Sequence, residues 1–283
     1  MRTIVHLSDI HFGRVDEAVV GPLIETVNQI TPDVVAVSGD LTQRARSHQF
    51  KAARAFLDSL PQPQIVVPGN HDVPLHNVFT RFAQPLHKYR RYITDDLRPL
   101  HHDDEIAVLG VNTARSFTIK GGRINQEQVD WMRDRLCSFD SKMVKLVVTH
   151  HPFDIPEGHD ERNLVGRARM AMERLASCGA DVFLAGHLHV SHTTHSARRY
   201  KIQGHSALVV QAGTATSDRG RGEANSFNVI RVERPNISVE RLEWQADLES
   251  FASAETENFR HSEDGWIRVE DNNSYDRLWL KSP

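Results

Sequence analysis

Short apolar runs recur along this 283-residue chain, and each is followed at once by a small polar cluster. The runs are rich in valine, isoleucine and leucine, which is typical of strands buried on both faces of a parallel sheet. The clusters consist of aspartate, asparagine and histidine, the side chains that bind metal ions or transfer protons. In chain order they contain Asp9 and His11, Asp40, Asn70 to Asp72, His150 and His151, and His187 and His189. Because open α/β sheets build their sites where strands end, we expect a polar site along one edge of such a sheet.

The segments between the first three runs have helical periodicity, which indicates the fold class. Apolar residues at positions 23, 24, 27 and 30, and again at 50, 53, 57 and 60, recur at the spacing of one helix face. Alternation of strands and helices predicts parallel strands joined by right-handed crossovers, and therefore an α/β fold. Three later strands, at 208–212, 227–232 and 237–242, have no helices between them. We expect these three to form a second, partly antiparallel sheet.

The domain organisation follows from the chain length and from two stretches that break the pattern. A chain of this length can bury one substantial core, so we expect a single domain at residues 1–245. Residues 74–105 are rich in histidine, arginine and tyrosine, and we interpret them as a helical excursion or cap over the edge of the sheet. Residues 246–283 are acidic and polar with isolated aromatic residues. We expect them to form a C-terminal tail that wraps the domain or contacts another protomer of a homo-oligomer.

Charge and hydropathy narrow the class of protein further. The net charge of −3 argues against stable nucleic-acid binding, which usually requires a basic excess. No apolar stretch approaches the ~18 residues of a membrane span, and the chain enters a strand-like run without a signal peptide. Cys137 and Cys178 form no CxxC pair, so we expect two half-buried thiols in helices and no disulfide framework. These features predict a cytoplasmic protein.

The polar clusters offer enough donor atoms for two neighbouring metal ions. Asp9 and His11 are two residues apart, so both can point the same way at a strand end, and His187 and His189 have the same spacing. Asp40 follows a glycine that lets the backbone turn sharply, and its two carboxylate oxygens can bridge two cations. Oxygen and imidazole ligands suit Mn, Fe, Co or Zn. Two such ions about 3.5–4 Å apart can hold the attacking and leaving oxygens during displacement at a phosphate ester.

With all five clusters in this order, the chain resembles the calcineurin-like metallophosphoesterases, and among them the bacterial class III cyclic-nucleotide phosphodiesterases. The resemblance spans residues 2–245. It includes residues 122–131, which are similar to the Gly-x-Leu-x-x-x-Gln-x-x-Trp helix entry of that group. Within this stretch, Asn125 and Gln128 are spaced as a capping box. The resemblance implies a four-layer αββα sandwich of two mixed sheets flanked by helices.

The resemblance also implies a role for each matching residue. One metal ion would be held by Asp9, His11 and His189, a second by Asn70, His150 and His187, and both would be bridged by Asp40. His71 would act as general acid or leaving-group stabiliser, and Asp72 would orient it. His150 and His151 are adjacent, and the resemblance favours His150 as the ligand.

Several residues near the clusters are candidates for substrate contacts. Arg44 and Arg46 follow the proposed bridging aspartate, and Asn112 and Arg115 follow a strand end. His192 follows the last histidine pair by three residues. Each of the five also fits an ordinary loop or surface position, where arginine and asparagine are common.

The donor set and the resemblance predict a metal-dependent phosphoric diester hydrolase. A hydroxide held between two ions would attack phosphorus in line, and His71 would protonate the departing alkoxide. The expected substrate is a small phosphodiester, with a 3′,5′- or 2′,3′-cyclic nucleotide as first choice. A phosphomonoesterase and a hydrolase of glycerophosphodiesters or lipid-linked phosphates are the alternatives. A DNA-repair nuclease would need a basic groove and an inactive binding module would have lost ligands, so both rank lower.

Overall fold

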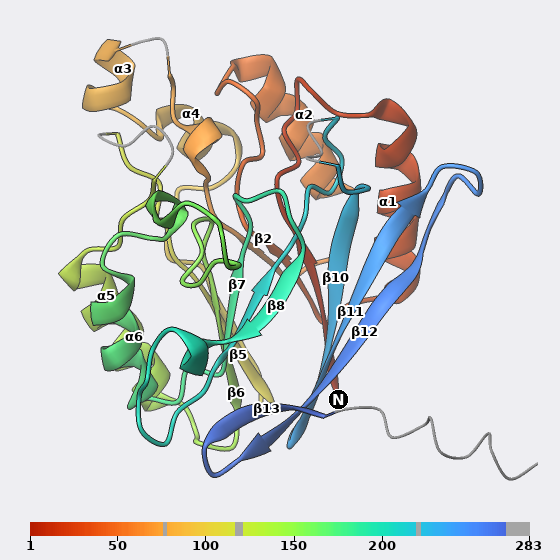
Figure 1. The fold of residues 1–283 in the computed structure, drawn as a ribbon. Helices are drawn as coiled ribbons and strands as arrows, with labels where there is room; N and C mark the ends of the chain where they lie inside the picture. The colour runs from red at the N-terminus through yellow and green to blue at the C-terminus, as the bar shows by residue number, and fades with distance from the viewer. Residues whose placement is uncertain (76–77, 117–120, 219–221, 270–283) are drawn as a thin grey trace, which may run out of the picture.

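Two mixed β-sheets form the centre of the molecule (Figure 1). The computed structural model describes residues 1–75, 78–116, 121–218 and 222–269. The first sheet has the strand order β13-β12-β11-β10-β1-β2-β3. Its strands are β1 (Arg2–Leu7), β2 (Val34–Val37), β3 (Gln64–Val66), β10 (Ser226–Glu233), β11 (Asn236–Gln245), β12 (Ser250–Ser262) and β13 (Gly265–Val269). The first three strands are parallel to one another, whereas β10 is antiparallel to β1 and the strands from β10 to β13 alternate in direction.

The second sheet has the strand order β4-β5-β6-β7-β9-β8. Its strands are β4 (Leu100–His102), β5 (Ile106–Gly110), β6 (Val144–Val148), β7 (Val182–Ala185), β8 (His192–His195) and β9 (Leu208–Gln211). The four central strands are parallel and all their residues are buried, while the edge strands β4 and β8 are antiparallel. The continuous apolar runs of the sequence therefore became parallel strands that are covered on both faces.

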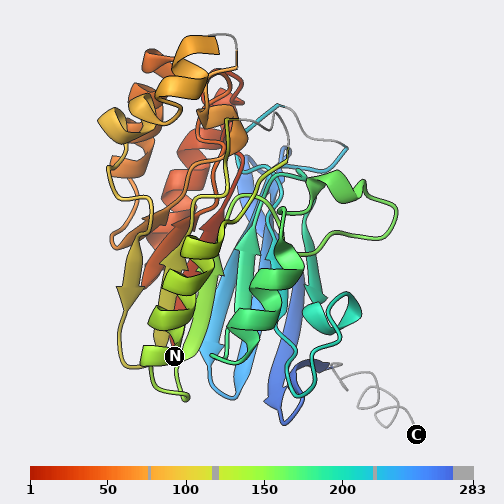
Figure 2. The same ribbon diagram turned by 90° about the vertical axis from the view of Figure 1, so that its left-hand side faces the viewer.

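Helices cover the outer faces of both sheets and complete four layers (Figures 1 and 2). The first sheet carries α1 (Glu17–Ile30) and α2 (Ser47–Asp58), and the second carries α5 (Gln126–Ser138) and α6 (Ala168–Ala176). The short helices α3 (Val78–Ala83) and α4 (His87–Tyr92) lie at the upper edge in Figure 1. Single 3₁₀ turns occur as η1 (Asn70–Asp72), η2 (Glu161–Asn163) and η3 (Ser196–Arg198). The α/β class and the four-layer sandwich are confirmed, and in the described part of the chain no helix has the length and apolarity needed to cross a membrane.

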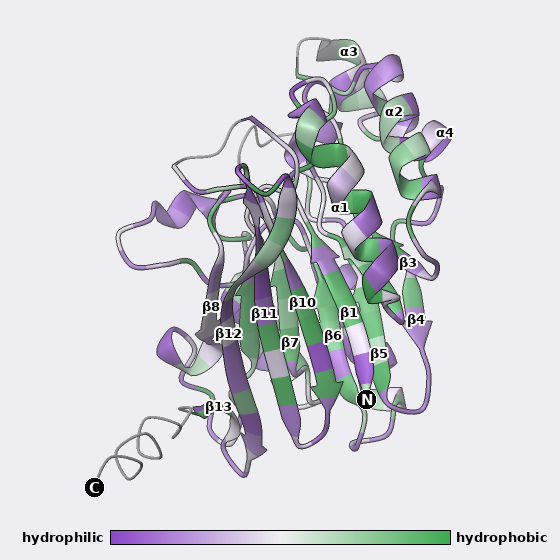
Figure 3. Cartoon of the chain, turned by 90° about the vertical axis from the view of Figure 1, so that its right-hand side faces the viewer, coloured by the Kyte–Doolittle hydropathy of each residue, from purple (hydrophilic) through white to green (hydrophobic). Residues whose placement is uncertain are grey.

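Three apolar clusters hold the layers together. One lies between the two sheets and includes Ile4 and Val148. A second packs the first sheet against α1 through residues such as Leu23, and a third packs the second sheet against α5 and α6 through Met132 and Leu175. Figure 3 shows hydrophobic residues concentrated in the central strands and hydrophilic residues along β12 at the edge. Because close-packed interiors deform little, this core fixes the strand ends that carry the polar clusters.

The pairing of the last strands corrects one expectation from the sequence. The strands at 208–212, 227–232 and 237–242 do not form a sheet of their own. Instead β9 pairs in parallel with β7 in the second sheet, while β10 and β11 extend the first sheet from β1. Apolar patterning indicates that a strand is buried, but it does not specify the edge with which the strand will pair.

Residues 250–269, which the sequence suggested as part of a C-terminal tail, form β12 and β13 in the first sheet. Phe259 and Trp266 are buried in the cluster between the sheets, and the indole nitrogen of Trp266 donates to Oδ1 of Asp181 at 2.8 Å. Most residues of β12 are polar and are exposed or half-buried, so this segment lacks the apolar run of a buried strand and was expected to be a tail. The remaining residues of the expected tail, 270–283, lie outside the described residues.

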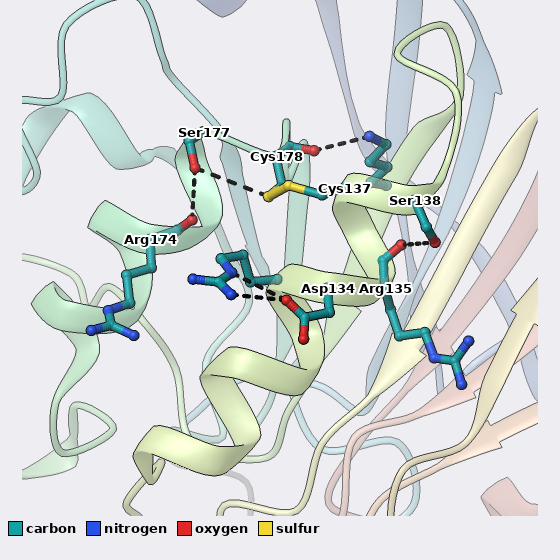
Figure 4. The surroundings of a disulfide bond; sticks show 9 residues. Asp134, Arg135, Cys137, Ser138, Arg174, Ser177 and Cys178 are labelled. Carbon is teal, nitrogen blue, oxygen red and sulfur yellow. Dashed lines mark hydrogen bonds and ion pairs between the residues drawn. A yellow bond between two sulfur atoms is a disulfide. The ribbon is translucent and has the colours of Figure 1, made fainter.

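The two cysteines are also a correction, because Cys137 and Cys178 form a disulfide (Figure 4). Cys137 lies in the last turn of α5 and Cys178 follows α6, and the two Cα atoms are 4.6 Å apart. The carbonyl of Cys178 accepts a hydrogen bond from Nζ of Lys145 at 2.9 Å. The residues are 41 positions apart in sequence, so only the packing of α5 beside α6 brings the sulfurs together. The pairing removes the cysteine-based reason for expecting a reducing compartment.

Removal of this disulfide should destabilise the protein strongly. The bond closes a loop of 41 residues, and the chain-entropy model assigns such a cross-link about 4 kcal/mol of unfolding free energy. We expect the Cys137→Ala/Cys178→Ala variant to unfold at a clearly lower guanidinium concentration than the oxidised wild type. Adding dithiothreitol should lower the wild-type midpoint and leave the variant unchanged. Equal midpoints for the wild type with and without reductant would contradict the cross-link.

A buried histidine in the core predicts an acid-sensitive fold. His6 in β1 is fully buried, its Nε2 lies 2.9 Å from Oγ of Ser38, and burial lowers its pKa to about 3. The unfolded chain, with an ordinary histidine pKa near 6.5, therefore binds one more proton between about pH 3 and pH 6.5. The unfolding free energy should consequently fall as the pH drops through this window, by up to about 1.4 kcal/mol per pH unit for this group.

The unfolding free energy of the His6→Gln variant should depend less on pH than that of the wild type, because glutamine does not titrate. Glutamine can keep a polar contact with Ser38. Urea midpoints measured at several values between pH 7 and pH 4 will show the difference. A substitution of the exposed His48 by glutamine is the control and should retain the wild-type slope. The interpretation fails if His6→Gln and wild type lose stability in parallel over this range.

Candidate metal centre

The polar clusters meet at the carboxyl ends of five parallel strands. Asp9 and His11 follow β1, Asp40 follows β2, Asn70 follows β3, His150 follows β6, and His187 and His189 follow β7. Five of these residues have left-handed backbone conformations, with φ of 51° at Asp9, 54° at His11, 52° at Asp40, 75° at His187 and 58° at His189. Non-glycine residues rarely adopt positive φ, and such strain persists where the surrounding structure over-determines it, often at functional sites. The strand ends are therefore held in an arrangement that local preferences alone would not produce.

A first group of donors contains Asp9, His11 and His189. Oδ1 of Asp9 lies 3.5 Å from Nε2 of His11 and 3.5 Å from Nε2 of His189, and the two imidazole nitrogens are 3.4 Å apart. The other carboxylate oxygen of Asp9 accepts hydrogen bonds from Oγ of Ser8 at 2.7 Å and from the backbone N–H of His187 at 2.9 Å. Within the described residues, Oδ1 of the fully buried Asp9 accepts no hydrogen bond. A buried carboxylate oxygen that accepts no hydrogen bond requires a nearby cation or hydrogen-bond donor.

A second group contains Asn70, His150 and His187. Oδ1 of Asn70 lies 3.0 Å from Nε2 of His150 and 3.1 Å from Nδ1 of His187. Nδ1 of His150 donates to the carbonyl of Ser38 at 2.8 Å, which directs Nε2 toward the amide oxygen of Asn70. An amide oxygen and two imidazole nitrogens converge here, and such a mixture of ligands is common at transition-metal sites. The donor set therefore fits a metal ion on chemical grounds.

Asp40 lies between the two groups. Its Oδ2 is 3.8 Å from Nε2 of His11 in the first group and 3.5 Å from Nε2 of His150 in the second. Its Oδ1 accepts the backbone N–H of His71 at 2.8 Å, which fixes the carboxylate. Gly69 makes this approach possible, since a Cβ atom there would lie 2.1 Å from Oδ1 of Asp40. One carboxylate oxygen is thus shared by both donor groups.

Protonation states in the centre suit metal ligands. Burial by itself would raise the pKa of Asp40, but the nearby imidazoles of His150 and His71 hold that pKa below its usual value. Burial likewise opposes ionisation of Asp9, yet His189 keeps its pKa well below the ordinary range. Burial and the neighbouring His150 lower the pKa of His187 to about 3. The carboxylates are therefore charged and His187 is neutral, as metal coordination requires.

His71 and Asp72 follow Asn70 directly and differ in their contacts. Nδ1 of His71 lies 3.0 Å from the carbonyl of Gln43 and donates to it, which turns Nε2 the other way. The ring packs edge-on against that of His11 with centroids 4.9 Å apart, so His71 borders the first donor group. His71 is partly exposed, and a substrate can reach it.

Asp72, which the resemblance implied would orient His71, makes hydrogen bonds to the loops after β2 and β3. Its oxygens accept the backbone N–H groups of Leu41, Thr42 and Gly69 and the hydroxyl of Thr42, at 2.9 to 3.1 Å. Burial and the charge of Asp40 raise the pKa of Asp72 to about 6. Asp72 therefore ties the loop after β2 to the loop after β3, and the carbonyl of Gln43 orients His71.

His151 lies beside His150 and His187. Its Nδ1 is 2.8 Å from Oγ1 of Thr113, and its ring centroid is 4.8 Å from that of His150 and 4.6 Å from that of His187. Ligand atoms of His150, His151 and His187 lie within 4.8 Å of one another. His150 is nevertheless the histidine that faces Asn70 and Asp40.

The five expected substrate contacts separate into three sets. Asn112 and Arg115 line one cavity of about 460 Å³ together with residues of α4. Arg44 and Arg46 are exposed in the loop before α2 and do not line this cavity. His192 at the start of β8 lines a small cavity of about 30 Å³ with Glu255 and Glu257 of β12.

Several residues that shape the centre escaped the sequence analysis. Ser38 and Gln43 act through backbone carbonyls, which leave no signature in a sequence. Thr113 holds His151 through its hydroxyl and was visible only as a residue after a strand. Gln128 was visible as a capping residue, but its contacts with Asn112 and Arg115 depend on the packing of α5.

Comparison with known proteins agrees with this geometry. Residues 2–191 match the family described as calcineurin-like phosphoesterase. The chain is 30% identical over 167 residues to a protein of Arcobacter nitrofigilis named as a probable glycerophosphodiester phosphodiesterase, GpdQ, with 58% of this chain and 59% of the relative covered. It is 26% identical over 134 residues to a probable cyclic nucleotide phosphodiesterase of Synechococcus sp., with 44% of this chain and 45% of the relative covered. The chain thus spans less than two thirds of the length of these relatives.

A solved structure supports the fold independently. A dimetal phosphatase from Danio rerio superimposes with a TM-score of 0.65 at 13% identity, and the match covers 92% of this chain and 99% of that one. The shared fold agrees with the family match over residues 2–191. The chain belongs to the calcineurin-like phosphoesterase family.

Proposed function

We propose that this protein is a dinuclear metal-dependent phosphodiesterase that hydrolyses a small phosphodiester. The observation that carries the proposal is the position of Asp40, whose Oδ2 lies within 3.8 Å of imidazole nitrogens from both donor groups. A carboxylate shared in this way is what a pair of adjacent cations needs as a bridge. The proposed ligands are Asp9, His11 and His189 for one ion, Asn70, His150 and His187 for the other, and Asp40 for both.

The metal ions would supply charge for the phosphate oxygens and a nucleophile near neutral pH. Residues of the chain would orient the metal ligands and donate the proton. Ser38 and the backbone N–H of His187 fix the orientation of His150 and Asp9 through hydrogen bonds. His71, held by Gln43 through Nδ1, would donate the Nε2 proton of its imidazolium form to the departing alkoxide. The mixture of oxygen and imidazole donors suits Mn, Fe, Co or Zn.

The proposal names first a general substrate class and then a specific substrate. A phosphodiester is supported by the names of the relatives in Arcobacter nitrofigilis and Synechococcus, both of which are diesterases. We favour a 3′,5′- or 2′,3′-cyclic nucleotide, in line with the name of the Synechococcus relative. A glycerophosphodiesterase is the second candidate, favoured by the name of the Arcobacter relative.

A substrate panel tests this proposal. Protein loaded in turn with Mn²⁺, Fe²⁺, Co²⁺ and Zn²⁺ is assayed against bis-nitrophenyl phosphate, nitrophenyl phosphate, cyclic nucleotides and glycerophosphodiesters. We expect faster turnover of diesters than of the monoester and no turnover after chelation. Preferential hydrolysis of nitrophenyl phosphate would indicate a phosphomonoesterase, and inactivity with every metal and substrate would support a binding module.

A further inference from the structure

A cavity of about 460 Å³ is lined by a half-buried arginine, Arg115. It lies between α4 and the loop after β5, and we call it the Arg115 pocket. Its walls include Val73, Leu86, Leu97, Asn112 and Arg115. Val73 follows the 3₁₀ turn η1, which carries the candidate general acid, so the pocket borders the proposed reaction site. Thr113, which follows Asn112, bonds to His151, and the ring of His151 lies 4.8 Å from that of His150.

Arg115 is held by neutral acceptors alone. Its Nη1 donates to the carbonyls of Asn112 at 3.4 Å and Ala114 at 3.0 Å, and its Nη2 donates to Oε1 of Gln128. Among the residues that the structure describes, no carboxylate pairs with it, and the charged neighbour acting on it is the cation Arg123. Burial and Arg123 together lower the pKa of Arg115. The half-buried guanidinium therefore has no carboxylate partner among the described residues and can accept an anion as a partner.

The guanidinium is also held in place before any ligand arrives. Oε1 of Gln128 accepts the backbone N–H of Asn125 at 3.0 Å in the capping box of α5, and its Nε2 donates to the carbonyl of Asn112 at 2.6 Å. The glutamine of the sequence motif at 122–131 therefore joins the start of α5, the β5 loop and Arg115 in one network. A cation fixed in this way loses little side-chain entropy when it binds an anion.

The remaining wall of the pocket also carries basic side chains. His87 and Arg90 of α4 line it, and no aspartate or glutamate does so among the described residues. Apolar side chains from Leu86 and Leu97 complete it. The pocket therefore suits a group that is partly apolar and negatively charged, and it disfavours a cationic head group.

We propose that the Arg115 pocket binds a second anionic group of the substrate, a phosphate or carboxylate beyond the scissile phosphodiester. This inference rests on the proposed phosphodiesterase function and narrows its substrate class. Substrates of this class include nucleotides that carry a further phosphate, whereas a choline-bearing diester is excluded by its positive charge. Arg115 would act as a specificity-determining residue, and Gln128 as a positioning residue.

Two synthetic diesters with a common leaving group test the proposal. They are 4-carboxyphenyl 4-nitrophenyl phosphate and its uncharged analogue, 4-carbamoylphenyl 4-nitrophenyl phosphate. The wild type should prefer the carboxylate ester by about tenfold in kcat/KM, the magnitude expected for one charge-assisted hydrogen bond. Arg115→Gln should lose this preference, chiefly through KM. Arg135→Gln, at an exposed arginine in the last turn of α5, is the matched control and should keep it.

The outcomes separate this inference from the function on which it rests. Equal turnover of both esters by the wild type, or a preference retained by Arg115→Gln, would overturn the anionic subsite. If neither ester is hydrolysed, the proposed function fails. The anionic subsite is then tested by ligand binding. Isophthalate should raise the melting temperature of the wild-type protein more than isophthalamide does. Absence of that difference would also overturn the proposal. If Arg115→Gln does not fold, the two wild-type comparisons decide alone.

Discussion

Replacing Asp40 by asparagine should reduce turnover by on the order of 10³-fold or more and remove metal at the same time. Asparagine keeps an oxygen that can accept the backbone N–H of His71, a contact of 2.8 Å in the native protein, so the loop should survive. It removes the negative charge that lies within 3.8 Å of His11 and 3.5 Å of His150. Both donor groups lose their shared ligand, and neither should hold its ion tightly.

Metal content measured by inductively coupled plasma mass spectrometry, beside kcat, checks this prediction. The wild type should bind about two ions per chain after reconstitution, as expected for a two-ion site. Asp134→Asn, at an exposed aspartate of α5, is the matched control and should resemble the wild type in both measurements. A variant at position 40 that keeps both ions and full turnover would show that the carboxylate does not bridge.

Replacing His71 by alanine should lower turnover by about 10²–10⁴-fold for substrates with alkoxide leaving groups. The imidazole is positioned by its own Nδ1 contact with Gln43 and borders the donor group of His11 without being part of it. Metal content should therefore remain that of the wild type. The loss should be much smaller for nitrophenolate, because a stable anion departs without needing a proton.

The dependence on leaving group distinguishes proton donation from a structural role. The measurement compares kcat for a cyclic nucleotide or glycerophosphodiester with kcat for bis-nitrophenyl phosphate in wild type, His71→Ala and His71→Gln. Glutamine restores much of the side-chain volume but cannot deliver a proton at an imidazole pKa. Equal losses for both kinds of leaving group would assign His71 a role in packing or in phosphate binding.

The candidate centre was largely predictable from the sequence because its chemistry is concentrated at strand ends. A buried parallel strand is an apolar run, and a polar residue can follow only where the strand leaves the core. Asp9, Asp40 and Asn70 each mark such a point, and the structure brings them together with four histidines at one edge of the molecule. The α/β class followed from the same pattern, because apolar period and helix spacing are local properties of the chain.

The contacts that tune the centre were not predictable in this way. Asp72 accepts hydrogen bonds from backbone N–H groups of two loops, and the sequence does not show these contacts. The carbonyl of Gln43 accepts a hydrogen bond from Nδ1 of His71, and a carbonyl has no residue-specific signal. The hydrogen bond between Arg115 and Gln128 could not be predicted, because it depends on the packing of α5 against the loop after β5.

The amino-acid sequence by itself determined most of the buried strands and amphipathic helices and which side chains carry donor atoms, because both depend on short-range pattern and residue type. Only the tertiary structure decided which strands pair, where β12 and β13 belong, and that Cys137 bonds Cys178. These features depend on contacts between residues far apart in the chain, whose energies arise from packing and hydrogen bonding across elements. A local sequence pattern therefore does not identify the distant residues that make these contacts.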